Sequence, residues 1–402
     1  MSWDDLDALE FDRLRRIIRE GSRGDRALLD LPNLDIAKAL GVVRDGRDGI
    51  EVRAGAVLLF GHEETLRAHI PTHEIAFQVL QGTRVEVNEF TRTPLFRVAE
   101  EALLRFRARR REDELRIGLL RVAVPDYDEE AFREAFANAL VHRDYTRLGA
   151  VHVQWHADRL EISSPGGFPP GVRIDNLLVV APSLRSAILA DAFKRAGLVE
   201  RTGRGVDLIY EGQLRYGRPA PRYGRSGPAG VIVEIPTGPF NEGLIRLVSE
   251  RADAGQSLQL TDLIVLNALH QERRLSINEL AASLQRDPTD ARGLINRMVD
   301  NGLVESRGES KGRTYHLSSA VYRALGEPAS YVRTRGIEPL QQEQMVLQYI
   351  ASHGRITRGQ AADLCQLAPA QATRLLARLR DRGAIEQVGS RRSAHYVAVP
   401  NN

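Results

Sequence analysis

Two polar side chains, Glu134 and Asn138, stand four residues apart in a segment with the spacing of an amphipathic helix. Residues four apart share one face of a helix, so we expect the two side chains to lie side by side. A carboxylate placed in this way can orient a water molecule and take its proton, and an amide oxygen can help to hold Mg²⁺. Taken alone, the pair also fits an ordinary solvated helix face.

Two glycine-rich stretches follow this helix. The first, Ser164 to Gly171, comes directly after an expected hairpin formed by 150–155 and 160–163. The second, Gly203-Arg204-Gly205, opens another expected helix. Glycine lets a backbone approach a flat ligand closely, and the amides at a helix start can hold phosphate. One G-x-G alone is a weak signal, but the ordered series of helix, hairpin, glycine loop and G-x-G helix indicates a nucleotide site.

This order resembles the GHKL ATPase superfamily, and more closely its divergent branch among the RecG-related, Schlafen-associated ATP-binding proteins. The resemblance covers nearly all of 1–236 and implies an ATP-binding sandwich of sheet and helices. The resemblance rests on four sequence stretches: REAFANALVHRDY (133–145), DRLEISSPGGFPPG (158–171), VERTGRGVDLI (199–209) and AGAVLLFG (54–61). The glycine-rich core of the Alb-like Schlafen domain of larger relatives is missing from this sequence, so the nuclease or RNA-related activity suspected there is not carried over. Helicase activity is not expected either, since no G-x-x-x-x-G-K-[ST] loop occurs.

The resemblance implies a role for each site residue. Glu134 would be the general base that activates water, which favours ATP hydrolysis without guaranteeing turnover, and Asn138 would bind Mg²⁺ and the cofactor. The remaining ATP contacts would be Ser164, Gly166, Gly167, Arg185, Thr202, Gly203, Arg204 and Gly205. Arg185 could equally be a surface arginine. Ser163-Ser164-Pro165 replaces the aspartate that binds adenine in mainstream members, so adenine would be held more weakly.

The elements ahead of this site mix helix and strand signals. Apolar spacing predicts helices over 4–20, 33–40 and 94–111, the last ending in an arginine cluster. The run Ala54 to Phe60 predicts a buried strand that ends at Gly61, and Thr72 to Leu80 predicts a second strand. No catalytic constellation occurs among these elements.

The C-terminal part repeats itself after a shift of about 81 residues. Leu266 falls on Leu347, Leu294-Ile295 falls on Leu375-Leu376, and Tyr315 falls on Tyr396. Each copy predicts a helix, a short strand, a helix, a turn, a third helix and a hairpin. Two copies are too few for a solenoid, so we expect two tandem domains.

Each copy resembles the winged helix-turn-helix family, which places its third helix in the major groove of DNA and its hairpin on the backbone. The residues that would contact DNA carry side chains suited to base edges or phosphates. In the first copy these are Arg292, Asn296, Arg297, Lys311 and Arg313, and in the second they are Gln371, Thr373, Arg374, Arg378, Arg391 and Arg392. The second copy has eight arginines against five acids, and the first has nine basic residues against eight acids. The second copy is therefore the better candidate for duplex DNA, although winged helices also bind proteins.

Composition sets the frame for these motifs. The chain has 402 residues, of which 43% are hydrophobic and 27% charged, which is ordinary for a globular protein. No apolar run approaches the roughly 18 residues of a membrane span, and the acidic N-terminus lacks the pattern of a signal peptide. The single cysteine, Cys365, excludes an internal disulfide. We therefore expect a cytoplasmic protein without membrane contact. Of its 56 basic residues 53 are arginine, which favours a bacterial source with a GC-rich genome.

These patterns predict a mixed α/β (α+β) chain with six parts. The parts are an N-terminal α/β segment (1–117), a GHKL-like ATP-binding domain (118–236), a linker (237–258), a first winged helix (259–325), a second linker (326–337) and a second winged helix (338–402). The favoured function is a DNA-binding transcriptional regulator whose ATP state biases docking on double-stranded DNA. Two alternatives stay open, namely a nucleotide-sensing module without hydrolysis and a protein-interaction component of phage defence. Dimerisation is a further hypothesis.

Overall fold

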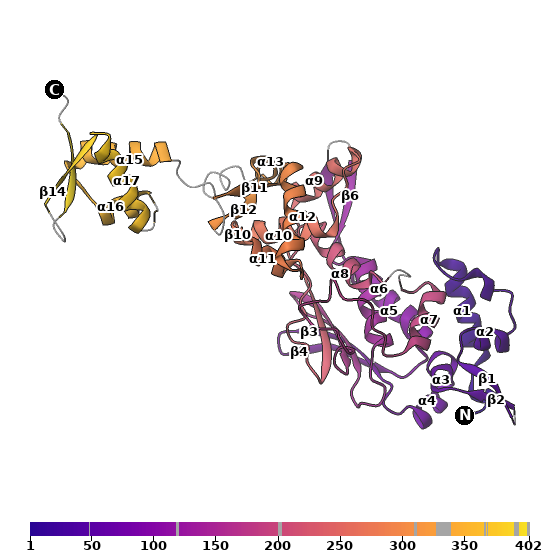
Figure 1. Ribbon diagram of the computed structural model, residues 1–402. Coiled ribbons are helices and arrows are strands. Elements are labelled where there is room, and N and C mark those ends of the chain that lie inside the picture. The colour runs from indigo at the N-terminus through magenta and orange to yellow at the C-terminus, as the bar shows by residue number, and fades with distance from the viewer. Residues whose placement is uncertain are drawn as a thin grey trace. The chain divides into compact units, whose positions relative to one another are not determined.

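The amphipathic pattern at the N-terminus folds into helix α1, Ala8–Glu20, which buries Phe11, Leu14 and Ile18. Asp7 begins the helix because its carboxylate accepts a hydrogen bond of 2.9 Å from the amide of Leu9. In the computed structural model shown in Figure 1, the described residues are 1–47, 49–117, 120–199, 203–308, 312–326, 339–365, 367, 369–389 and 394–399.

The run Ala54–Phe60 forms helix α3, so the prediction of a buried strand here is wrong. Its residues from Ala56 to Phe60 are all buried, because α3 packs against α1, α4 (Glu63–His69) and α5 (Leu95–Arg109). A short apolar run that is covered on every side has no polar face, so its periodicity cannot distinguish a helix from a strand.

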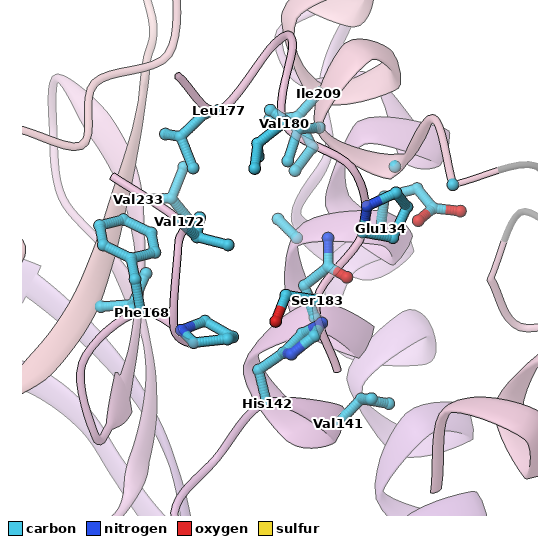
Figure 2. A pocket seen from close by; sticks show the side chains of 18 of the residues that line it. Glu134, Val141, His142, Phe168, Val172, Leu177, Val180, Ser183, Ile209 and Val233 are labelled. Atoms are coloured by element: carbon cyan, nitrogen blue, oxygen red, sulfur yellow. The ribbon is translucent and has the colours of Figure 1, made fainter. Parts of the chain in front are cut away.

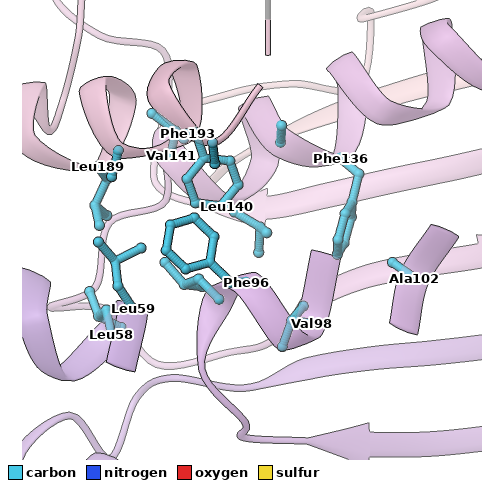
Figure 3. Close-up of a cluster of buried hydrophobic side chains, with 14 of the residues drawn as sticks. Leu58, Leu59, Phe96, Val98, Ala102, Phe136, Leu140, Val141, Leu189 and Phe193 are labelled. Carbon is cyan, nitrogen blue, oxygen red and sulfur yellow. The ribbon is translucent and has the colours of Figure 1, made fainter. Parts of the chain in front are cut away.

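Aromatic side chains join these helices into one core. Phe60 of α3 stacks on Phe11 with ring centroids 3.9 Å apart, and Phe96 of α5 lies between Phe60 and Phe193 of α7 (Ala187–Ala196). Figure 3 shows Phe96 and Phe193 packed with Leu140 where α5, α6 and α7 meet. The smaller elements of this part are Trp3–Asp5 (η1), Arg26–Leu28 (η2), α2 (Asn33–Ala39), β1 (Val43–Gly46) and β2 (Gly49–Val52).

A five-stranded sheet stands beside this helical layer, with the strand order β4-β3-β7-β8-β9. Its strands are β3 (Ile75–Gln81), β4 (Arg84–Thr91), β7 (Val151–Trp155), β8 (Arg159–Pro165) and β9 (Gly230–Pro236). Strands β3 and β7 run parallel, and the other neighbours are antiparallel. Helix α6 (Glu129–Val141) packs on β7 and β8, while α5 and α7 pack on α6. A helical layer therefore separates the sheet from α1 and α3 (Figure 1). The strand expected over Thr72–Leu80 and the hairpin after α6 are confirmed.

Between α5 and α6 the chain forms a separate hairpin of β5 (Glu112–Ile117) and β6 (Leu120–Pro125). Its side chains Leu115 and Val124 form a small buried cluster with Ile245 of α9 (Glu242–Asp253). The expected linker 237–258 thus contains a helix that packs on this hairpin.

The 81-residue repeat reappears in the structure element by element. The first copy consists of α10 (Leu260–Glu272), β10 (Leu275–Ser276), α11 (Ile277–Ser283), α12 (Pro288–Asp300), β11 (Val304–Arg307) and β12 (Thr314–Leu317), and α13 (Ser319–Ala324) follows it. The second consists of α15 (Pro339–His353), β13 (Ile356–Thr357), α16 (Arg358–Cys365), α17 (Pro369–Asp381), β14 (Ile385–Val388) and β15 (His395–Ala398). Each copy has a three-stranded sheet with its last strand in the centre. The repeated winged-helix topology is confirmed.

The fold class is mixed α+β, and the chain divides into two compact units, Met1–Tyr315 and His316–Asn402. The second unit holds the core of the second winged helix, around Leu375 and Leu376. In the part of the chain that the structure describes, no helix combines the length and the apolar character needed to cross a membrane.

Candidate functional site

Helix α6 carries Glu134 and Asn138, the first two residues of the predicted site. Asp128 caps the helix by accepting a hydrogen bond of 2.9 Å from the amide of Ala131, and Arg215 pairs with the same carboxylate. Glu134 is only 3% exposed, whereas Asn138, one turn later, is half-buried. Glu134 therefore does not lie on a solvated helix face. A buried carboxylate on a helix that also packs on the sheet is held in a fixed place.

The G-x-G segment lies directly against this pair. A Cβ atom added to Gly205, the first residue of α8 (Gly205–Leu214), would lie 2.6 Å from Oε2 of Glu134 and 3.4 Å from Nδ2 of Asn138. Any larger residue at this position would force the end of the Glu134 side chain, or the start of α8, to shift. Gly203, with φ of +80°, packs against Pro182 in the same way. Thr202 lies outside the described residues.

The first glycine loop is fixed by its own contacts. Gly166 has φ of +96°, and a Cβ there would lie 2.6 Å from that of Asp144. Arg185 donates from Nε to the carbonyl of His142 (2.8 Å) and from Nη2 to the carbonyl of Gly167 (2.7 Å). Ser164 donates its hydroxyl to the carbonyl of Ala139 (2.7 Å). Arg185 and Ser164 thus position the loop, and their contact with a nucleotide stays a prediction.

These residues surround a cavity of about 400 Å³. Figure 2 shows an apolar side with Phe168, Val172 and Val233, and an opposite side with Glu134 and His142. Asn138, Ser164, Gly166, Gly203 and Gly205 line the same cavity. The cavity therefore gathers sequence motifs that lie up to seventy residues apart into one place, with room for a flat apolar group beside a polar end.

One wall of the cavity is a long segment without helix or strand, 166–186, which we call the lid segment. Its residues from Leu177 to Leu184 line the cavity, and Ile174, Val179 and Leu184 are exposed apolar side chains. A structureless stretch of this length inside a folded unit is typical of a binding loop.

The polar end carries charged groups that the motifs did not reveal. These are Lys194 and Arg286, which line the cavity. Arg204, which the sequence predicts as an ATP contact, lies 3.6 Å from Asp207 in the first turn of α8, and its contact with a nucleotide stays a prediction. Burial raises the pKa of Asp207, while Arg204 and Arg286 oppose this shift. Lys194 and Arg286 offer cationic groups that suit phosphate, and they share the lining with the carboxylates of Glu134 and Asp207.

His142, directly after α6, is a third residue that motif reasoning missed. Burial lowers its pKa, as does the neighbouring charge of Arg185. Its Nδ1 atom is buried and has no hydrogen-bond partner among the described residues. Because a buried polar atom without a partner is costly, the ring is suited to receive a hydrogen bond from, or donate one to, a ligand in the cavity.

Within the described ranges, no cluster of three or more His, Cys, Asp or Glu side chains could hold a metal ion. Asn138 remains the predicted Mg²⁺ ligand. A single protein oxygen is compatible with Mg²⁺ bound to nucleotide, because Mg²⁺ keeps several waters and takes its other ligands from phosphates.

The predicted DNA-contacting residues lie mainly on the exposed faces of α12 and α17. Arg292 and Asn296 are exposed on α12, whereas Arg297 bonds Asp262 of α10 at 3.2 Å. On α17 the exposed residues are Gln371, Thr373, Arg374 and Arg378, the last of which lies 3.8 Å from Glu343. Arg313 is exposed beside β12. The wing-tip residues Lys311, Arg391 and Arg392 lie outside the described residues.

Three family descriptions match separate parts of the chain. Residues 149–233 match "Putative ATP-dependent DNA helicase recG C-terminal", residues 246–402 match "DNA glycosylase AlkZ-like", and residues 1–76 match a domain of unknown function. The chain therefore carries an ATPase-type domain like that of RecG C-terminal proteins and a winged-helix region like that of AlkZ-like proteins. The first match begins after α6 and so does not include Glu134 or Asn138. The link to Schlafen-associated proteins stays a prediction.

A solved structure with the same fold is the DIP2311 protein from Corynebacterium diphtheriae. The TM-score is 0.65 at 21% sequence identity, and the match covers 99% of this chain and 69% of that one. No protein in the curated collection matches the chain. This similarity establishes a shared fold.

Proposed function

We propose that this protein is a nucleotide-responsive DNA-binding regulator, which binds ATP with Mg²⁺ in the cavity and DNA with its winged helices. The observation that carries the nucleotide half is the approach of Gly205 to Glu134 and Asn138 at the polar end of the cavity. The family matches to an ATPase-type domain and to an AlkZ-like DNA glycosylase region support the two halves.

The residues at hand fit an adenine nucleotide. The apolar side, with Phe168 and Val172, suits the base, and the glycines at the start of α8 suit phosphates. Lys194 and Arg286 supply positive charge, and His142 offers a ring nitrogen that has no hydrogen-bond partner in the described part of the chain. Bound Mg²⁺ would neutralise phosphate charge, and Asn138 would hold it through its amide oxygen.

Glu134 is the group that would make the site hydrolytic. Its buried carboxylate would accept a proton from a water molecule at one of its oxygen atoms and orient that water toward the phosphates. Burial excludes bulk water around the carboxylate, which strengthens its interactions with polar groups in the cavity. Slow hydrolysis at this site, followed by release of ADP and phosphate, would return the protein to its nucleotide-free state.

Titration calorimetry with ATP and Mg²⁺ tests the nucleotide half. We expect micromolar binding by the wild type and its loss in Asn138→Ala. Gly224→Ala is the matched control, because Gly224 has no neighbour within 4 Å of an added Cβ. Absence of binding to the wild type would leave the ATPase-type fold as a scaffold.

DNA binding is tested by fluorescence anisotropy over a range of salt concentrations. We expect affinity to fall steeply with salt, since each neutralised phosphate releases counterions. Arg374→Ala should relax sequence preference, with exposed Arg355→Ala as the control outside the reading helix. Affinity for duplex that does not respond to salt would favour the alternative in which the winged helices bind protein. Nucleotide binding that changes DNA affinity without ATP turnover would favour the nucleotide-sensing module. Analytical sedimentation would test the proposed homodimer.

A further inference from the structure

The turn between α11 and α12 of the first winged helix contacts the lid segment. The side-chain amide of Gln285 donates a hydrogen bond of 3.0 Å to the carbonyl of Ile174 and accepts one of 2.8 Å from the amide of Leu178. One side chain thus satisfies two backbone groups of the lid segment. Gln285 has φ of +55°, a left-handed conformation that glutamine rarely adopts. The turn is therefore held in a specific shape while it contacts the lid segment.

The next residue, Arg286, belongs to the wall of the cavity. It lines the same space as Glu134 and Lys194, although it comes from the winged helix and they come from the ATPase-type fold. It also lies within electrostatic range of Asp207 in the first turn of α8. An exposed guanidinium at the polar end of a cavity is well suited to a phosphate, which it can bind through two parallel hydrogen bonds.

The internal repeat shows that a winged helix does not need this arginine. The residue that corresponds to Arg286 after the shift of 81 is Leu367, which packs against the core of the second copy. The residue at this position is thus apolar and packed on the core in one copy, and charged and part of the cavity wall in the other. Since the topology is shared, the difference points to a task specific to the first copy.

Two structural connections lead from this contact to the predicted reading helix. Asp287, adjacent to Arg286, caps α12 by accepting from the amides of Thr289 and Asp290. Helix α8, which begins at Gly205 beside Glu134, packs against α10 of the same winged helix. A group bound at the polar end of the cavity would therefore touch elements that are directly connected to the first winged helix.

We propose that Arg286 is a phosphate-binding residue that the first winged helix supplies to the nucleotide site, and that Gln285 is a positioning residue that couples the lid segment to helix α12. This inference rests on the proposed nucleotide function and names the residues that carry its regulation. The occupied cavity holds α12 in one placement, and the empty cavity releases it.

Calorimetry with two ligands tests the role of Arg286. In Arg286→Ala we expect ATP affinity to fall roughly ten- to a hundredfold, the range for a lost hydrogen bond to a charged group. Affinity for adenosine, which has no phosphate, should change by less than twofold. The control is Arg246→Ala, which removes an exposed arginine of α9 outside the cavity. Equal loss for ATP and adenosine would show a structural role and overturn the assignment.

Hydrogen exchange of the α12 amides, with and without ATP, tests Gln285. We expect ATP to slow exchange in the wild type, and this effect to disappear in Gln285→Asn while ATP still binds. Asparagine suits the left-handed turn but is one methylene too short to span both lid contacts. ATP-dependent protection that persists in this variant would overturn the coupling. Failure of the wild type to bind ATP would instead refute the proposed function, whereas normal ATP binding by Arg286→Ala would refute only this inference.

Discussion

Replacing Gly205 by alanine is the most direct perturbation of the nucleotide site. The new Cβ would lie 2.6 Å from Oε2 of Glu134, which is about 0.9 Å inside the roughly 3.5 Å separation that heavy atoms prefer. The atom that must give way is the end of the Glu134 side chain, whose movement is restricted by burial. Glu134 is 3% exposed, and α8 packs along α6, which carries that carboxylate. The substitution must therefore displace Glu134 or the start of α8.

Overpacking of this kind costs about 1–3 kcal/mol, which corresponds to roughly a 5- to 150-fold loss of affinity when the displaced groups bind the ligand. We expect Gly205→Ala to weaken ATP binding within this range in calorimetry, and Gly224→Ala to leave it unchanged. Thermal denaturation of both variants controls for folding. Unchanged ATP affinity together with an unchanged free energy of unfolding in Gly205→Ala would refute the packing argument.

Three further perturbations test other parts of the molecule. Glu134→Gln should retain ATP binding within a few-fold but lose phosphate release in a steady-state assay; undiminished release would remove Glu134 from the proposed chemistry. Gly293→Ala, inside α12 with open space around the added Cβ, should raise the free energy of unfolding by about 0.5–1 kcal/mol in urea titrations; a decrease would indicate a hidden contact. Burial lowers the pKa of His73 to about 4 from 6.5, so the unfolded chain binds more protons between these values. The free energy of unfolding should therefore fall as the pH drops from 6.5 to 4, by up to about 3 kcal/mol from this residue, and His73→Gln should flatten the profile; a parallel profile would assign the loss to other groups.

The sequence predicted best those features that depend on local order along the chain. The repeat placed α12 and α17 with the same 81-residue offset that the structure has, because helix starts such as Pro288 and Pro369 are local signals. Glu134 and Asn138 came together because the spacing within one helix fixes which residues share a face. The glycines of the second stretch, Gly203 and Gly205, predicted a close approach of the backbone to another group, but they did not show that this group is Glu134.

Features that depend on contacts across the fold could not be predicted in this way. The segment Ala54–Phe60 is helical because neighbours cover all its sides, which an isolated apolar run does not reveal. Gln285 and Arg286 carry no motif. The contact of Gln285 with the lid segment, and the place of Arg286 in the cavity wall, depend on packing between segments more than a hundred residues apart. The sequence places His142 at the end of a helix, but it does not predict that the ring lines the cavity. The available signal for Arg286 was its replacement by Leu367 in the second copy.

The two winged helices differ in ways that favour different tasks within the proposed function. In the first copy the turn before α12 contacts the lid segment, and Arg297 of α12 is tied to Asp262. Its nine basic residues are nearly balanced by eight acids, which leaves little net charge to attract phosphates. The second copy has eight arginines against five acids and carries Arg374 on an exposed face. A domain that is held by the nucleotide site is suited to transmit its state, whereas one with surplus positive charge is suited to bind DNA. Substitutions on α17 should therefore weaken DNA binding more than equivalent substitutions on α12. Substitutions on α12 should instead reduce the effect of ATP on DNA binding.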